Sequence, residues 1–250
     1  MSYRMFSKWI TCPHPNPDAT CRLFCLPFAG GGASTYRLWA PGLPSWIEVC
    51  PCQLPGREDR YREAAFTNLI ALSRALSREL TPYLDKPYAI FGHSLGALLA
   101  FELARSLRHA QAPPPLAMLL SAYPAPHVPP ERPIHELPDV EFIEEMRRMQ
   151  GTPDKVLANR EMMEFMLPIL RADFQACDTY VNTPEPPLSC PFFMFGGAED
   201  VDIGEPDLER WREHTAGTFT VEMLPGTHFF VQSQRDRLLA AIGGHLARLI

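Results

Sequence analysis

The feature that most constrains this chain is a serine between two glycines, placed where a strand pattern changes to a helix pattern. Residues 92–96 read Gly-His-Ser-Leu-Gly. Residues 87–91 predict a short buried strand, and residues 97–109 carry apolar side chains at helical spacing without an internal proline or glycine. A G-x-S-x-G segment at a strand-to-helix turn is typical of a nucleophile elbow, so Ser94 is the candidate nucleophile. The alternative is a glycine-bracketed turn with a solvated serine.

Strand and helix patterns alternate along the whole chain. The expected strands are residues 23–28, 47–54, 87–91, 116–121, 191–195 and 219–224. The expected helices are residues 33–40, 66–80, 97–109, 208–214 and 231–249. Repeated strand-helix units predict an α/β fold with a mainly parallel sheet and helices on both faces. We expect one domain, residues 1–250, because a chain of this length can bury one large core.

The segment 126–190 breaks this alternation, since it gives no strand where one is due. Apolar residues in it recur at helical spacing, which predicts a helical lid inserted within the domain. Five of the ten methionines fall between positions 146 and 166. Most are expected to pack the helices against the core, but a flexible thioether surface can also mould itself to apolar ligands. The candidates for lining a substrate channel are Met146, Met149, Met162 and Met166.

Composition and charge exclude several classes of function. The net charge is −6 and no long basic run occurs, so we expect no nucleic-acid partner. No run of about 18 apolar residues is present, so no membrane span is predicted, and residues 1–18 lack the continuous apolar core of a secretory signal. A cytoplasmic protein is therefore expected. Seven cysteines without a complete metal-ligand spacing predict core packing and no metal site.

A serine nucleophile at an elbow needs an acid and then a histidine, in that chain order. After the expected strand that ends at residue 121, no carboxylate occurs before Glu131. After the strand that ends at residue 195, a Gly-Gly turn is followed by three acids. We predict Asp200 as the acid, because this turn suits a loop that bends back over the sheet edge. Glu199 and Asp202 are the fallbacks, and a solvated acidic loop is the alternative.

The base is expected in the loop after the last strand. His228 follows a Pro-Gly turn signal there and precedes the closing helix. His93 adjoins the nucleophile, but its position in the elbow favours packing or orientation of the local backbone. In the predicted mechanism Ser94 attacks a carbonyl, His228 takes and later delivers the proton, and Asp200 fixes the imidazole tautomer.

The oxyanion of such a reaction needs two backbone donors. We predict the N–H of Leu95, directly after the nucleophile, and the N–H of Ala29, in the glycine-rich loop after the first strand. A phosphate or dinucleotide cradle is the rival interpretation of this glycine run. The phosphate-loop sequence is missing, and the G-x-G-x-x-G spacing breaks at Thr35.

Seven segments along the chain carry recognisable motifs. They are residues 26–31 (Leu-Pro-Phe-Ala-Gly-Gly), 53–58 (Gln-Leu-Pro-Gly-Arg-Glu), 92–96, 151–153 (Gly-Thr-Pro), 167–173 (Leu-Pro-Ile-Leu-Arg-Ala-Asp), 196–197 (Gly-Gly) and 226–228 (Gly-Thr-His). Together these motifs resemble one family, the discrete type II editing thioesterases that accompany polyketide synthases and nonribosomal peptide synthetases. The resemblance spans nearly the whole chain, and its most selective parts are the Leu-Pro-Gly-Arg turn and the Leu-Pro-x-Leu-Arg-Ala-Asp segment.

The resemblance implies an α/β-hydrolase fold with a mobile helical lid and a triad of Ser94, Asp200 and His228. It also implies hydrolysis of stalled or wrong acyl groups from the phosphopantetheine arm of acyl or peptidyl carrier proteins. These carrier domains would be the partners, and no metal or organic cofactor is implied. The residues alone reach only acyl transfer, so the thioester substrate depends on the resemblance.

Three alternatives remain beside this function. A small-molecule carboxylesterase or lipase would use the same triad, and a catalytically silent binding module could use the same fold. A terminal domain that releases full-length product is a closer variant, disfavoured by the expectation that this chain is free-standing. For docking of an acidic carrier protein, the candidates are Arg57, Arg60 and Arg62, or Arg147 and Arg148, although solvated arginines are the alternative.

Overall fold

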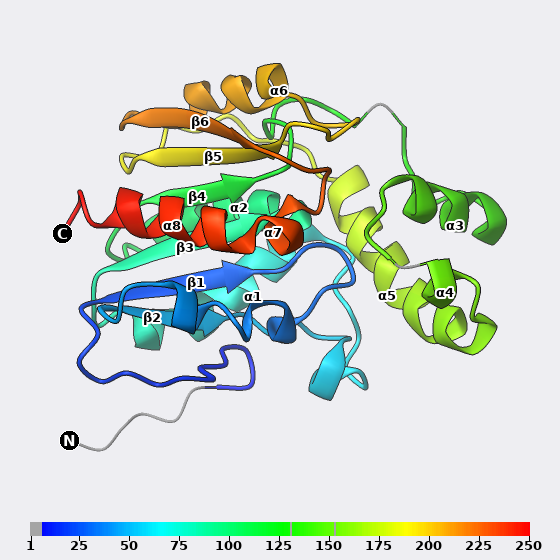
Figure 1. Cartoon of the computed structure of the whole chain (residues 1–250), viewed down its shortest axis with the longest axis horizontal. Helices are drawn as coiled ribbons and strands as arrows, with labels where there is room; N and C mark the ends of the chain where they lie inside the picture. The colour runs from blue at the N-terminus through cyan, green and yellow to red at the C-terminus, as the bar shows by residue number, and fades with distance from the viewer. Residues whose placement is uncertain (1–6, 131, 153) are drawn as a thin grey trace.

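The centre of the molecule is a six-stranded sheet, seen in a computed structural model that describes residues 7–130, 132–152 and 154–250. Pro153 of the Gly-Thr-Pro segment therefore lies outside the described residues. The strand order is β2-β1-β3-β4-β5-β6, and every neighbouring pair is parallel, which confirms the predicted α/β sheet (Figure 1). The strands are β1 (Cys21–Leu26), β2 (Ile47–Pro51), β3 (Tyr88–His93), β4 (Met118–Ser121), β5 (Phe192–Gly197) and β6 (Phe219–Leu224).

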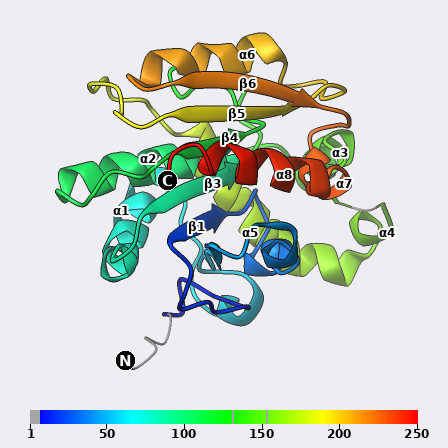
Figure 2. The same ribbon diagram turned by 60° about the vertical axis from the view of Figure 1, so that its left-hand side comes forward.

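Helices cover both faces of the sheet (Figure 2). On one face, α1 (Leu69–Leu80), α2 (Leu95–His109) and α6 (Glu205–Glu209) share a buried apolar cluster with the strands. On the other face, α8 (Arg235–Leu246) contributes to a second cluster. Because apolar side chains are needed on both faces, β1 to β5 are buried at every residue and are mostly apolar, with Arg22 of β1 and Glu48 of β2 paired to each other.

Two of the expected helices differ from the prediction. The helix expected over 33–40 is a pair of short 3-10 turns, η1 (Ala33–Tyr36) and η2 (Ala40–Gly42). Gly32 supplies no side-chain cap at the start of η1, and Pro41 sits in the first turn of η2. The closing helix expected over 231–249 divides into α7 (Phe230–Ser233) and α8, because Gln234 between them leaves the helical region with φ −113° and ψ 25°.

The remaining expected helices are shifted at their ends. α1 begins at Leu69, because the side chain of Asn68 accepts a hydrogen bond from the Ala71 N–H and caps the helix there. The helix expected over 208–214 starts earlier as α6 and continues as a 3-10 turn, η5 (Arg210–His214). Among the described residues, no helix is both long and apolar enough to cross a membrane.

Three helices occupy the segment between β4 and β5. They are α3 (Asp139–Arg148), α4 (Asp154–Leu157) and α5 (Arg160–Asp178). In Figure 1 they lie beyond the arrowheads of the strands, at the right of the view. Phe142, Met146, Met163 and Leu170 form an apolar cluster of their own within these helices, together with Leu157. The helices thus pack as a separate unit over the carboxyl ends of the strands, where ligands of parallel sheets bind.

Candidate active site

Ser94 sits on a strained turn between β3 and α2. Its φ of 55° and ψ of −124° lie in a backbone region that residues other than glycine rarely adopt. A Cβ at Gly92 would come 2.0 Å from the carbonyl oxygen of Gly96, and a Cβ at Gly96 would come 2.2 Å from that of Leu26. Only glycine fits at both positions, so the spacing of the motif follows from the close approach of strand and helix. The Ser94 N–H donates to the Ser121 carbonyl at 2.8 Å and ties the turn to β4.

Asp200 and His228 lie in contact at the ends of β5 and β6. Asp200 Oδ2 is 2.8 Å from His228 Nδ1, and the aspartate side chain is only 1% exposed. Asp200 Oδ1 accepts from the N–H groups of Asp202 and Ile203 at 3.0 and 3.3 Å. Burial raises the pKa of the Asp200 carboxyl, but the hydrogen bond and charge of His228 outweigh it and hold this pKa below its ordinary value. The acid is therefore ionised and fixes the imidazole.

The other two acids of this loop point elsewhere. Glu199 is exposed, and Asp202 is ion-paired with Arg148 of α3 at 2.5 Å. Of the three candidates, the structure brings Asp200 to the histidine. Because the acid engages Nδ1 of His228, Nε2 is the ring nitrogen that remains for a further hydrogen bond.

Ser94 and His228 line two adjoining cavities. The first has a volume of about 270 Å³ and walls that are mainly apolar, and the four methionines predicted from the sequence all line it. The second, of about 420 Å³, is more polar. Ala29 also lines both. Residues of the segment between β4 and β5 line both cavities, and Met149 and Phe174 of this segment belong to both.

The two predicted oxyanion donors lie at this junction. Leu95 is the first residue of α2, and the first N–H groups of a helix have no partner within the helix. The Ala29 loop is bent sharply, because Gly30 has a φ of 75° and the Gly31 N–H donates to the Phe28 carbonyl at 2.9 Å. Both donors thus come from backbone that is held by local geometry, as an oxyanion hole requires.

His93 packs behind the site. It is fully buried, and its Nδ1 is 2.8 Å from Ser121 Oγ. Its ring meets that of Phe28 edge to face, with 5.9 Å between centroids. Burial lowers the pKa of His93 well below 6.5, and the neighbouring His228 lowers it further. His93 is therefore a neutral packing residue of the elbow, as its position in the motif indicated.

A buried ion pair joins the Leu-Pro-Gly-Arg turn to the Leu-Pro-x-Leu-Arg-Ala-Asp segment. Both nitrogens of the Arg57 fork donate to the Asp173 carboxylate at 2.8 Å, and both side chains are at most 4% exposed. Asp173 belongs to α5, in the lid. The signal that could have found the pair is that Arg57 and Asp173 close the two most selective motifs, Leu-Pro-Gly-Arg and Leu-Arg-Ala-Asp.

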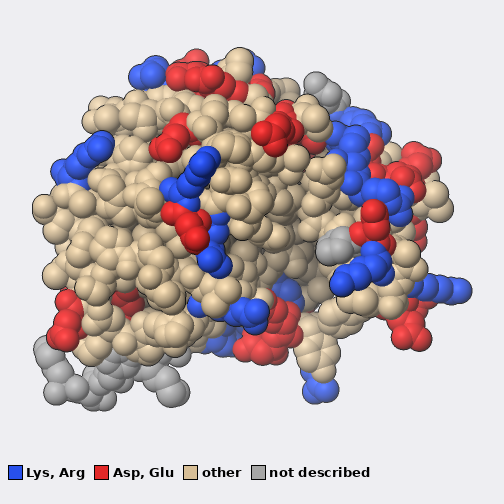
Figure 3. All heavy atoms as spheres, viewed as in Figure 1, with Lys and Arg blue, Asp and Glu red and all other residues tan. Residues whose placement is uncertain are grey.

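The same burial corrects one docking hypothesis. Arg57 and Arg60 are each 3% exposed, so neither can offer its charge to a partner protein. Arg62, the third arginine of that group, is exposed, and its Nε donates to the Tyr61 hydroxyl at 2.8 Å. Arg147 and Arg148 are more than 40% exposed at their side chains, but each is paired with two carboxylates. Figure 3 shows basic and acidic side chains interspersed over the lid, at the right of the view. Both of these exposed arginines therefore have their charge balanced by neighbouring carboxylates.

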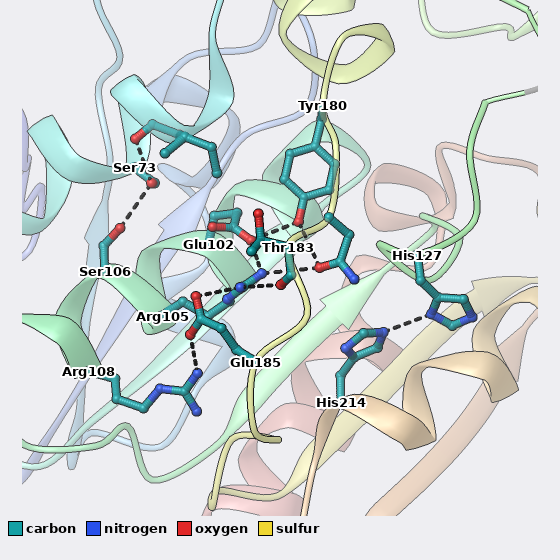
Figure 4. A network of polar contacts seen from close by, with 12 residues as sticks. Ser73, Glu102, Arg105, Ser106, Arg108, His127, Tyr180, Thr183, Glu185 and His214 are labelled. Carbon is teal, nitrogen blue, oxygen red and sulfur yellow. Dashed lines mark hydrogen bonds and ion pairs between the residues drawn. The ribbon is translucent and has the colours of Figure 1, made fainter.

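Two further groups of titratable side chains lie outside the site. His127 Nδ1 is 2.9 Å from His214 Nε2 beside a third cavity, of about 230 Å³, that shares no lining residue with the other two (Figure 4). Among the described residues, one group of three side chains has the donors for a metal ion, namely Cys12, Glu48 and Cys50. Glu48 already bonds to the Arg22 guanidinium at 2.8 Å, which indicates a structural role.

Comparisons with known proteins agree with this geometry. The sequence profile of the thioesterase domain family matches residues 21–246. LgrE of Brevibacillus parabrevis, which bears the name linear gramicidin dehydrogenase, is 44% identical over 240 residues, 94% of this chain and 91% of the relative.

Two solved structures are similar in both sequence and fold. RedJ, a thioesterase from the prodiginine biosynthetic pathway in Streptomyces coelicolor, has 41% identity and a TM-score of 0.87 over 90% of each chain. BorB, a type II thioesterase from the borrelidin biosynthetic cluster, has 36% identity and a TM-score of 0.88 over 98% of this chain and 100% of that chain. This similarity confirms the predicted α/β-hydrolase fold.

Proposed function

We propose, from the premise that this chain belongs to the thioesterase domain family, that it removes acyl groups from the phosphopantetheine arm of carrier proteins. Its place would be a polyketide or nonribosomal peptide pathway, where it would clear stalled or wrong acyl units. RedJ and BorB, which resemble this chain, come from biosynthetic pathways and are thioesterases by name. The partners are then acyl or peptidyl carrier domains of a synthase.

The observation that carries this proposal is the position of Ser94 between an apolar cavity and a more polar one. An acyl thioester on a pantetheine arm has this division, with a hydrocarbon chain on one side of the carbonyl and a polar amide-bearing arm on the other. The methionine-lined cavity suits the acyl chain, because thioether side chains adapt to apolar groups of varied shape. The second cavity suits the arm, and its walls include Tyr123, Arg132 and Arg148.

The proposed reaction uses Ser94, His228 and Asp200 in the roles of a serine triad. His228 accepts the serine proton while Oγ attacks the thioester carbonyl carbon, and Asp200 stabilises the resulting imidazolium. The N–H groups of Ala29 and Leu95 bind the oxyanion. When the intermediate collapses, the C–S bond breaks and His228 protonates the leaving thiolate. Water then attacks the acyl-serine with His228 as base, which releases the carboxylic acid and restores Ser94.

The dehydrogenase name of LgrE does not carry over to this chain. A dehydrogenase that uses a nicotinamide cofactor binds it at a glycine-rich turn with G-x-G-x-x-G spacing, which breaks here at Thr35. The glycine loop instead contributes Ala29 to the cavities around Ser94. The proposed reaction uses no metal or organic cofactor.

A carrier-protein assay tests the proposal. A phosphopantetheinyl carrier protein is loaded with an acetyl group, and loss of this group is followed by mass spectrometry with the native enzyme and with Ser94→Ala. We expect prompt hydrolysis that the substitution abolishes. A matched oxygen ester of the same acyl group is run in parallel. Native turnover of the oxygen ester alone would contradict the proposal and indicate a small-molecule esterase.

A further inference from the structure

The Arg57–Asp173 pair touches the loop that carries the Ala29 N–H. Asp173 Oδ2 accepts a hydrogen bond from the Gly30 N–H at 2.7 Å, in addition to the bond from Arg57. Arg57 Nη1 also donates to the Gly31 carbonyl at 3.3 Å. The Asp173 carboxylate on α5 therefore accepts hydrogen bonds from the Arg57 guanidinium and also from the N–H of Gly30 in the glycine loop.

These bonds fix the peptide units on both sides of Ala29. The Phe28 carbonyl, which shares a peptide plane with the Ala29 N–H, accepts from the Gly31 N–H at 2.9 Å. The next peptide plane carries the Gly30 N–H, which Asp173 holds. Gly30 has a positive φ of 75°, a conformation that glycine enters and leaves at low cost, so the loop needs an external support to stay in one geometry.

We propose that Asp173 is a positioning residue of the oxyanion hole, which keeps the Ala29 N–H aimed at the reacting carbonyl oxygen. The inference rests on the proposed acyl-transfer function of Ser94. An oxyanion hole accelerates the reaction only when its donors are held in place before charge develops. A bidentate, buried carboxylate is a rigid acceptor for this purpose, since Arg57 fixes both of its oxygens. Since Asp173 lies on α5, the hole is complete only while this helix is seated.

Two double variants separate this role from a general effect of the ion pair. Replacing one partner alone would strand a buried charge and could unfold the protein, whereas a charge-free pair of similar volume is often tolerated. Arg57→Met with Asp173→Leu removes the charges and the acceptor for the Gly30 N–H. Arg57→Met with Asp173→Asn removes the same charges but keeps an oxygen that can accept this bond. The two variants thus share the loss of charge and differ in the side chain at position 173, where only asparagine offers an acceptor.

Each variant is assayed for kcat and KM on acetyl-N-acetylcysteamine and on p-nitrophenyl acetate. The rates are divided by the concentration of active sites, which is measured by titration to completion with a fluorophosphonate. Loss of one oxyanion donor costs about 100- to 1000-fold in kcat, so a displaced donor in the leucine variant should cost about 10- to 100-fold. KM should change little, and the asparagine variant should recover most of the loss. The affinity for a trifluoromethyl ketone, whose adduct with serine mimics the oxyanion, should fall with kcat.

A buried ion pair elsewhere is the matched control. Glu102 and Arg105 of α2 lie 2.7 Å apart at similar burial (Figure 4). Glu102→Leu with Arg105→Met should leave kcat per active site unchanged. Native kcat in the leucine variant, or an equal loss in the asparagine variant, would overturn the inference. Any acyl transfer at Ser94 needs the oxyanion hole, so the ester substrate tests the role of Asp173 independently of the thioester. A native enzyme that cleaves the ester but no thioester would overturn the proposed function and leave the role of Asp173 testable.

Discussion

The imidazole of His93 lies 5.4 Å, centroid to centroid, from the imidazole of His228. The rings of Phe229 and Phe230 are each 5.8 Å from His93. Burial keeps the pKa of His93 well below 6.5, so this neighbour of the proposed base carries no charge at neutral pH. The site can therefore form one imidazolium during the reaction without a second cation beside it.

His93→Phe tests this arrangement, because it keeps an aromatic ring in the elbow and removes the titrating group. We expect the profile of kcat/KM against pH to show the same number of ionisations as that of the native enzyme. Stability should fall by about 1–3 kcal/mol, since Ser121 Oγ loses its buried partner. Loss of one ionisation from the profile would show that His93 titrates in the free enzyme and would contradict its assignment as a neutral residue.

Asp200→Asn should remove most of the activity while the protein stays folded. An amide cannot stabilise the imidazolium and favours the wrong tautomer, a change that costs about 10⁴-fold in a serine protease triad. The measurement is kcat on an acyl thioester together with the melting temperature. Glu199→Gln is the control, because this acid is exposed and one position away. A larger loss from Glu199→Gln than from Asp200→Asn would reassign the acid.

Met166→Trp should shorten the acyl chains that the enzyme accepts. Met166 lines the apolar cavity of about 270 Å³, and a larger ring there takes up room for methylene groups. One methylene in an apolar pocket is worth about 10- to 200-fold in kcat/KM, so octanoyl thioesters should lose at least about tenfold relative to acetyl thioesters. Met166→Ala should enlarge the cavity and raise the ratio of octanoyl to acetyl kcat/KM. An unchanged octanoyl-to-acetyl ratio in both variants would place the acyl chain elsewhere.

His214 should make the fold sensitive to acid. Burial lowers its pKa from 6.5 to about 4, and the nearby His127 adds to this effect. As pH falls below 6.5, the unfolded chain takes up the proton first, so the stability from this group is present above pH 6.5 and is lost progressively down to about pH 4.

Urea denaturation of the native protein and of His214→Gln, at about pH 7 and about pH 4.5, measures the effect. Between about pH 7 and about pH 4.5, the free energy of unfolding should fall more for the native protein than for His214→Gln. The difference should be on the order of 1 kcal/mol, a modest value because His214 is only half buried. Glutamine can keep a hydrogen bond to His127. Equal losses in the two proteins would mean that His214 does not contribute to the acid sensitivity.

The sheet was predictable because each strand is a short apolar run that can be recognised from its local sequence. β6 has the predicted bounds, and the other strands differ only at their ends. The prediction of one helix over residues 33–40 was wrong. The apolar side chains of this segment pack against the sheet from two short 3-10 turns and do not form the face of a continuous helix. Tyr36 and Trp39, for example, are both buried against Phe91. Periodicity cannot distinguish these two arrangements.

The site was predictable only where chain order decides it. The elbow and the histidine after the last strand follow from their places in the alternation. The choice among three neighbouring acids depends on how the loop bends, and here the Asp200 N–H donates back to the Gly197 carbonyl at 3.1 Å. The contact between Arg57 and Asp173 spans 116 residues, and no local pattern specifies a tertiary contact of this kind. Helices between β4 and β5 were expected, but the hydrogen bond from the Gly30 N–H to Asp173 of α5 was not.

β6 is one of the two edge strands of the sheet, and it is only half buried up to Leu224. The nucleophile instead follows β3, which is fully buried between β1 and β4. Regions with fewer buried contacts open at a lower free energy than the core. On warming, His228 should therefore leave its working position while Ser94 still holds its own, so that catalysis stops below the melting temperature and returns on cooling. The peripheral strand, and not the core, then sets the upper temperature at which this protein works.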